Sequence, residues 1–152
     1  MSTIIYIGVV MAKEEKTAWI MLLVTLGAYA IYLALLLGRV GSGVLVKTPY
    51  RDLILWTVLC SILANIFLSI LVSIINHRDN HKKDLRDREI YRFSEYIGQA
   101  FIVIGGVSAL LMAMYEVQYF WIANVLYLGF VLSAVLSSIS KIMMYRRGVP
   151  RW

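Results

Sequence analysis

Four stretches of the chain contain no charged residue and consist mostly of apolar side chains. They are residues 17–37, 53–75, 96–115 and 117–140, which contain 21, 23, 20 and 24 residues. An α-helix rises about 1.5 Å per residue and the hydrocarbon core of a bilayer is about 30 Å thick, so about 20 residues suffice to cross it. The pattern therefore predicts an all-α integral membrane protein, a four-helix transmembrane bundle.

The segments between these stretches are short and divide the chain into two hairpins. We expect an N-terminal flank at 1–16, a first transmembrane hairpin at 17–75, a charged cytoplasmic segment at 76–95, a second hairpin at 96–141 and a basic tail at 142–152. None of the segments outside the four apolar stretches is long enough to form a soluble catalytic domain. Residues 1–10 are apolar but too short to span. One hypothesis is that Met11 is the natural start, and the alternative is that residues 1–10 form an apolar tail that lies on the bilayer.

Composition supports the membrane prediction. Hydrophobic residues make up 61% of the 152 residues and charged residues 16%, against about half and about a quarter in soluble domains. The mean hydropathy is +0.75. The single cysteine, Cys60, excludes an intramolecular disulfide.

Basic residues are distributed unequally between the two predicted sides of the membrane. Of 15 lysines and arginines, twelve lie in the N-terminal flank, in the middle segment and in the stretch that begins at Lys141, and three lie in the first loop, namely Arg39, Lys47 and Arg51. The positive-inside rule then places both termini and the middle segment in the cytoplasm. The net charge of +6 is thus an orientation signal, and we expect no nucleic-acid partner.

Aromatic residues gather at the predicted membrane boundaries, as amphipathic rings do at headgroup level. Those at the outer boundary are Tyr50, Trp56, Tyr115, Tyr119, Phe120 and Trp121.

No Asp, Glu, Lys, Arg or His lies within the predicted spans, which argues against proton relays and ion exchangers. Three amides do lie there, Asn65, Gln99 and Asn124. Because such groups need hydrogen-bond partners away from water, we expect them to bond one another across helices. Their alternative role is to line a path in a small transporter.

Small residues recur every fourth position in each predicted span, which allows close helix approach. They are Ala30, Ala34 and Gly38; Ser69 and Ser73; Gly105, Ala109 and Ala113; and Ser133 and Ser137. We expect these faces to pack within the bundle, with a homodimer through one leftover face as the alternative.

The segment before the third span is the most distinctive part of the chain. Acidic and basic residues alternate there at helical spacings, which predicts a cytoplasmic helix that continues into the span. We expect an opposite-charge lattice along it, which joins Asp84 to Arg88 and Arg88 to Glu95 by way of Arg92. Leu85, Ile90, Phe93 and Ile97 supply an apolar side for the membrane surface. Candidate residues for docking to a soluble cytoplasmic protein partner or to lipid headgroups are Lys82, Lys83, Asp84, Arg86, Asp87, Arg88, Glu89 and Arg92.

The same segment offers a metal-site hypothesis. His77 and His81 are four residues apart, so a helix would place both on one face with Asp84 nearby. Imidazole and carboxylate suit zinc and related ions. No third ligand is fixed by the spacing, and we expect no cofactor.

The run from Asp84 through Tyr96, followed by an apolar span with Gly105-Gly106, resembles the charged motif of small prokaryotic membrane proteins of the domain-of-unknown-function 2178 type. The resemblance covers about residues 79–147, and Leu85 departs from the acidic residue often seen there. It implies a bacterial or archaeal inner-membrane protein without an established activity, in a regulatory or stress context.

Three function classes follow. The first is a non-enzymatic inner-membrane protein that acts through contacts of its charged cytoplasmic segment, in an accessory, regulatory or immunity-like role. The alternatives are a small transporter or permeability factor with a polar path between helices, and a membrane enzyme that uses His77, His81 and Asp84.

Overall fold

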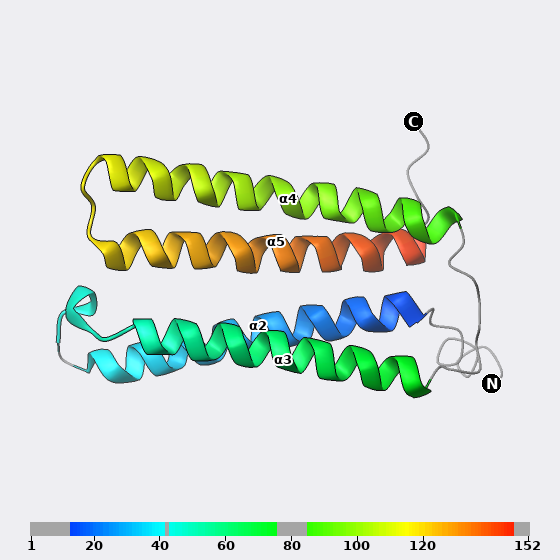
Figure 1. Ribbon diagram of the computed structural model, residues 1–152, viewed down its shortest axis with the longest axis horizontal. Coiled ribbons are helices and arrows are strands. Elements are labelled where there is room, and N and C mark those ends of the chain that lie inside the picture. Colours follow the sequence, from blue (N-terminus) through cyan, green and yellow to red (C-terminus); the bar gives the residue numbers. More distant parts are fainter. Residues whose placement is uncertain (1–12, 42, 76–84, 148–152) are drawn as a thin grey trace.

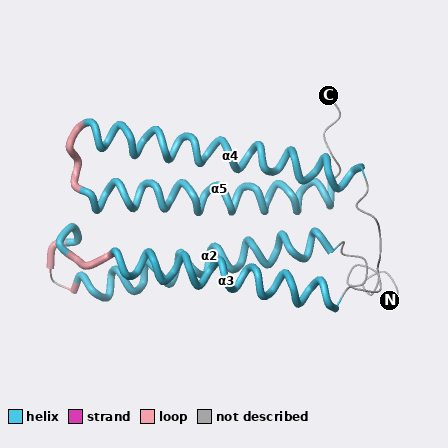
Figure 2. Tube along the Cα trace, viewed as in Figure 1, coloured by secondary structure: helices cyan, strands magenta, loops and turns pink. Residues whose placement is uncertain are grey.

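The computed structural model describes residues 13–41, 43–75 and 85–147, and every described helix lies within one of these ranges. The elements are α2 (Lys13–Val40), the 3-10 helix η1 (Leu45–Lys47), α3 (Arg51–Ile75), α4 (Leu85–Met114) and α5 (Tyr119–Arg147) (Figure 2). The proposed start at Met11 and the candidate residues His77, His81, Lys82, Lys83 and Asp84 lie outside the described residues.

The prediction of four long apolar helices is confirmed. Each of α2, α3, α4 and α5 is long and apolar enough to cross a membrane. The predicted helical extension is also confirmed, because α4 runs without a break from Leu85 through the charged residues into the apolar stretch. Its 30 residues span about 45 Å, more than the hydrocarbon core of a bilayer.

The four helices pack in the order α3, α2, α5, α4 (Figure 1). The largest interface joins α4 to α5, and α2 packs against both α3 and α5. Within the described residues α3 and α4 share no comparable interface, so the bundle is open on that side. Buried residues of α3 are confined to Leu53 and Thr57 near its start, and most of its apolar side chains are exposed.

The two ends of the molecule differ. At one end, called here the terminal end, α2 and α4 begin and α3 and α5 end (Figure 1). At the other, the loop end, η1 and the turn at residues 115–118 connect the helices. The short turn makes α4 and α5 antiparallel neighbours, as predicted.

Small residues bring α4 and α5 together. A Cβ atom added at Gly105 would lie 3.0 Å from the Cα atom of Gly129, and one added at Gly98 would lie 2.9 Å from the carbonyl oxygen of Ser133. Gly105, Ala109, Ser133 and Ser137 are buried, which confirms the predicted packing faces on these helices, whereas Ala113 is exposed.

The small residues of α2 do not follow this prediction. Ala30, Ala34 and Gly38 are exposed, and a Cβ atom added at Gly38 would meet nothing within 4 Å. The other side of α2 supplies the packing instead, through Tyr32 and Leu36, which are buried in the core. Large aromatic and aliphatic side chains bury more apolar area than small ones, so they determine which side of α2 faces its neighbours.

Aromatic rings connect the two hairpins. Tyr32 of α2 contacts Tyr127 of α5 edge to face, with 5.1 Å between the ring centroids. Tyr127 donates a hydrogen bond of 3.3 Å to the hydroxyl of Thr57 on α3. This cluster, together with Leu36, Leu53, Phe120 and Val131, forms the core nearer the loop end.

Candidate functional site

At the terminal end, three polar side chains of α5 bind acidic side chains of neighbouring helices. Lys141 forms an ion pair of 2.8 Å with Glu95, and Tyr145 donates a hydrogen bond of 2.9 Å to Asp87, both on α4. Arg146 forms an ion pair of 3.1 Å with Glu15 on α2. The helices are therefore joined where they leave the apolar segments.

Helical spacing explains this alignment. On α4, Asp87, Tyr91 and Glu95 are four residues apart and lie on one side of the helix. Because α5 runs antiparallel, its Tyr145 and Lys141 meet them in reverse order, and the ammonium of Lys141 lies 4.6 Å from the ring centroid of Tyr91. Ser137 extends the row by donating a hydrogen bond of 3.2 Å to Glu95.

The predicted charge lattice along α4 is therefore corrected. Glu95 was expected to interact with Arg88 through Arg92, but its ion-pair partner is Lys141 on the neighbouring helix. Exposed ion pairs within one helix contribute only a few tenths of a kcal/mol. The side chain of Lys141 is only 13% exposed, so its desolvated ammonium requires an acceptor, and Glu95 supplies one.

The remaining charged residues of this segment lie at the surface of the protein. Arg86, Arg88, Glu89 and Arg92 are exposed, whereas Asp87 is partly buried. The structure thus separates the charges of α4: Asp87 and Glu95 bind α5, and the exposed remainder is predominantly basic. Arg88 and Arg92 are four residues apart and share one side of α4, and we call these two residues the basic surface.

The predicted apolar side of this segment is also corrected. Ile90 is fully buried inside the protein, rather than being available to the membrane surface. Phe93 and Ile97 are half-buried, and only Leu85 is largely exposed, at 76%.

The three amides within the apolar segments do not come together. Asn124 accepts a hydrogen bond from Tyr32 and donates one to the carbonyl of Phe120. Asn65 donates to the carbonyl of Ser61 in its own helix, and Gln99 is exposed. The expected mutual hydrogen bonding is wrong, because a tyrosine hydroxyl of α2 and backbone carbonyls supply the partners.

Among the residues that the structure describes, no group of three or more His, Cys, Asp or Glu side chains is arranged to hold a metal ion. His77, His81 and Asp84 are not among those residues. The metal-site hypothesis stays a prediction.

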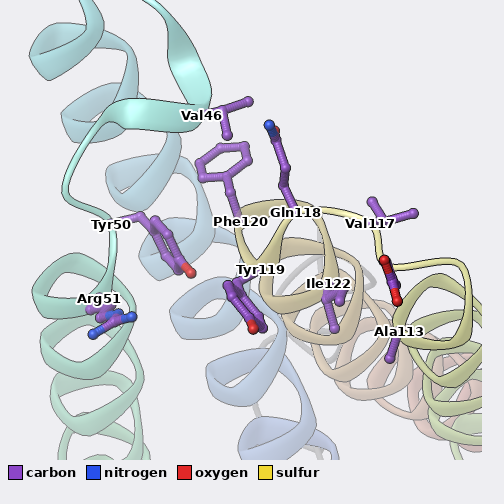
Figure 3. A pocket seen from close by; sticks show the side chains of 10 residues that line it. Val46, Tyr50, Arg51, Ala113, Val117, Gln118, Tyr119, Phe120 and Ile122 are labelled. Carbon is purple, nitrogen blue, oxygen red and sulfur yellow. The ribbon is translucent and has the colours of Figure 1, made fainter.

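A pocket at the loop end was not predicted. Its volume is about 690 Å³, and it lies between the start of α3 and the turn that joins α4 to α5 (Figure 3). Arg51 and Tyr50 line it from the first hairpin, and Gln118 and Tyr119 from the second. Both tyrosines are expected at one membrane boundary from their positions in the sequence, but only the fold brings the two hairpins together around a cavity.

Two other charged residues at the loop end, Arg39 and Asp52, pair with each other. Arg39 forms an ion pair of 2.7 Å with Asp52 and also donates to the carbonyl of Pro49. Asp52 precedes the charge-free stretch 53–75, and its hydrogen bond with Arg39 lowers the pKa of its carboxyl group. Arg39 is thus occupied by Asp52.

Comparison with protein-family models, with curated proteins and with solved structures gives no match for this chain. The resemblance to the domain-of-unknown-function 2178 type therefore stays a prediction that rests on the sequence motif alone.

Proposed function

We propose that the chain is an integral membrane protein with four spans and with both termini on the cytoplasmic side of a prokaryotic inner membrane. Four long apolar helices with many exposed large side chains support insertion into the bilayer. The ends of α2, α3, α4 and α5 that adjoin basic flanks lie at the terminal end, which supports the orientation. The prokaryotic assignment follows from the motif resemblance.

We further propose that the protein is non-enzymatic and acts by binding an acidic surface of a soluble cytoplasmic protein. The main support for this function is that the acidic side chains Asp87 and Glu95 of α4 bind α5, whereas arginines of the same helix remain exposed. Asp87 and Glu95 bind side chains of α5, while Arg88 and Arg92 remain exposed on one side of α4 as a basic surface. Complementary charge on a partner accelerates association and selects among partners.

The two alternatives receive less support. A polar path for a transporter would need Asn65, Gln99 and Asn124 to line one route, but each has a different environment. An enzyme would rest on His77, His81 and Asp84, which lie outside the described residues. A homodimer through the exposed Ala30, Ala34 and Gly38 face is compatible with the docking function.

The test is co-purification from native membranes in nanodiscs, with mass spectrometry of the bound proteins. In the double variant Arg88→Glu with Arg92→Glu, we expect recovery of a stoichiometric partner to fall about tenfold or more, because two attractive charges become repulsive. Asp87 is unsuitable for this test, since replacing it also removes the hydrogen bond from Tyr145.

Lys47→Glu is the matched control. It reverses the charge of an exposed residue at the opposite end of the molecule, so partner recovery should equal that of the wild type. Equal recovery with the double variant would contradict docking through the basic surface.

A further inference from the structure

The pocket at the loop end lies among aromatic side chains typical of the membrane–water boundary. Trp56, Tyr115 and Trp121 at this end are 65%, 81% and 45% exposed. Exposed rings of this kind favour the depth of lipid headgroups. If the helices span a bilayer, as proposed above, the pocket opens where headgroups lie.

Two opposite charges line this pocket without neutralising each other. Arg51 begins α3, and Glu116 belongs to the turn after α4. The ion pairs among the described residues join Arg39 to Asp52, Lys141 to Glu95 and Arg146 to Glu15, and thus include neither side chain. A pocket with a separate cation and anion is complementary to a ligand that carries both charges.

The backbone at Glu116 gives independent support. Its φ is +55°, in the left-handed region, and its N–H donates to the carbonyl of Ala113 while that of Val117 donates to Met112. This pair of hydrogen bonds is the Schellman motif, in which glycine is usual at the left-handed position. A glutamate there costs stability, so its carboxylate is a candidate for function.

The other lining residues suit an amphiphilic ligand. Tyr50 and Tyr119 offer hydroxyl donors, and Gln118 offers an amide, while Val46, Phe120 and Ile122 are apolar (Figure 3). Phe120 is buried and contacts the ring of Tyr50 at 5.2 Å between centroids, which fixes one wall. The volume of about 690 Å³ lies within the range of small-molecule sites.

We propose that this pocket binds the headgroup of a phospholipid that carries both a phosphate and a primary ammonium group, as phosphatidylethanolamine does. Arg51 and the tyrosine hydroxyls bind the phosphate, and Glu116 accepts hydrogen bonds from the ammonium. The apolar wall contacts the glycerol end of the acyl chains. This site rests on the membrane insertion proposed above but not on docking through the basic surface.

The proposal is tested by native mass spectrometry of the full chain in detergent micelles that contain equal amounts of phosphatidylethanolamine, phosphatidylcholine and phosphatidylglycerol. We expect about tenfold preferential retention of phosphatidylethanolamine over each of the others. The choline headgroup has no N–H donor for Glu116, and the glycerol headgroup has no cation. Equal retention of the three lipids by the wild type would overturn the proposal without any variant.

Two variants separate the roles of the charges. Arg51→Gln should reduce retention of phosphatidylethanolamine and phosphatidylglycerol alike, since both present a phosphate. Glu116→Gly should abolish the preference for phosphatidylethanolamine over phosphatidylglycerol, while thermal stability stays equal or rises because glycine suits the left-handed position. A Glu116→Gly protein that keeps the preference would contradict the proposal.

Lys47→Gln is the matched control, because it removes an exposed charge at the loop end from a residue that does not line the pocket. It should leave lipid preference unchanged. Reconstitution into lipid nanodiscs separates the two proposals: a protein that does not insert fails both, and one that inserts without lipid preference fails only the headgroup site.

Discussion

Individual glycines determine how closely α4 and α5 approach. At Gly98 and Gly105 the neighbouring helix occupies the space where a side chain would begin, whereas Gly106 has open space beside it. Three glycines of one helix thus have different structural roles. Close backbone approach strengthens dispersion contacts, which are important where lipid provides no hydrophobic drive for helices to associate.

Gly98→Ala should reduce the free energy of unfolding by about 1–3 kcal/mol, because the new methyl group overlaps the Ser133 carbonyl and the Ser137 side chain. Gly106→Ala is the control and should cause no loss, since its methyl group meets nothing within 4 Å. Thermal unfolding in detergent micelles measures both. Equal stability of the two variants would show that α4 and α5 accommodate the added methyl group at position 98 without losing stability.

At the element scale, α5 is the helix that connects the two hairpins to each other. It packs against both α4 and α2, and its terminal end carries Lys141, Tyr145 and Arg146, which bind acidic residues of those helices. Helix α3, by contrast, is buried only near its start. The charged start of α4 therefore belongs structurally to the second hairpin, and only its outward side remains for a partner.

Reversing one charge between α4 and α5 should be destabilising, and exchanging both should restore stability. Lys141→Glu places a carboxylate beside Glu95 and removes the cation from Tyr91, which should cost more than the ~1 kcal/mol typical of exposed ion pairs, because Lys141 is only 13% exposed. Adding Glu95→Lys should recover most of that loss. A double-mutant cycle by thermal unfolding measures the coupling, and purely additive effects would exclude a direct interaction.

At the scale of the whole molecule, the fold places distant parts of the chain at common ends. The start of α2 and the end of α5 lie at the terminal end, and the two connections within the hairpins lie at the loop end (Figure 1). The basic surface and the pocket therefore occupy opposite ends of the molecule. In a membrane, they would face opposite sides.

Single cysteines introduced in a Cys60→Ser background test this arrangement in intact cells. We expect a membrane-impermeant thiol reagent to label Lys47→Cys directly, and to label Arg147→Cys only after permeabilisation, because the positive-inside rule places the terminal end in the cytoplasm. Both native residues are exposed. The reverse pattern would invert the proposed orientation, and labelling of both without permeabilisation would contradict four spans.

The sequence by itself determined the elements. Charge-free stretches of about 20 residues can satisfy their backbone hydrogen bonds in lipid as helices, and the alternating charges before Tyr96 extend the third of these helices outward. The connection around residues 116–118 is so short that the third and fourth spans must be antiparallel neighbours. These are local properties, so they can be read without knowing which helix meets which.

The tertiary structure decided the partners and therefore the candidate sites. Small residues at fourfold spacing occur on α2 and on α4, yet Gly105 is buried and Ala34 is exposed, because the facing surface determines which stripe is used. Likewise Glu95 binds Lys141, and Asn124 binds Tyr32, across separations of 46 and 92 residues. Such contacts depend on the rotation and order of the helices, which no local pattern in one chain specifies.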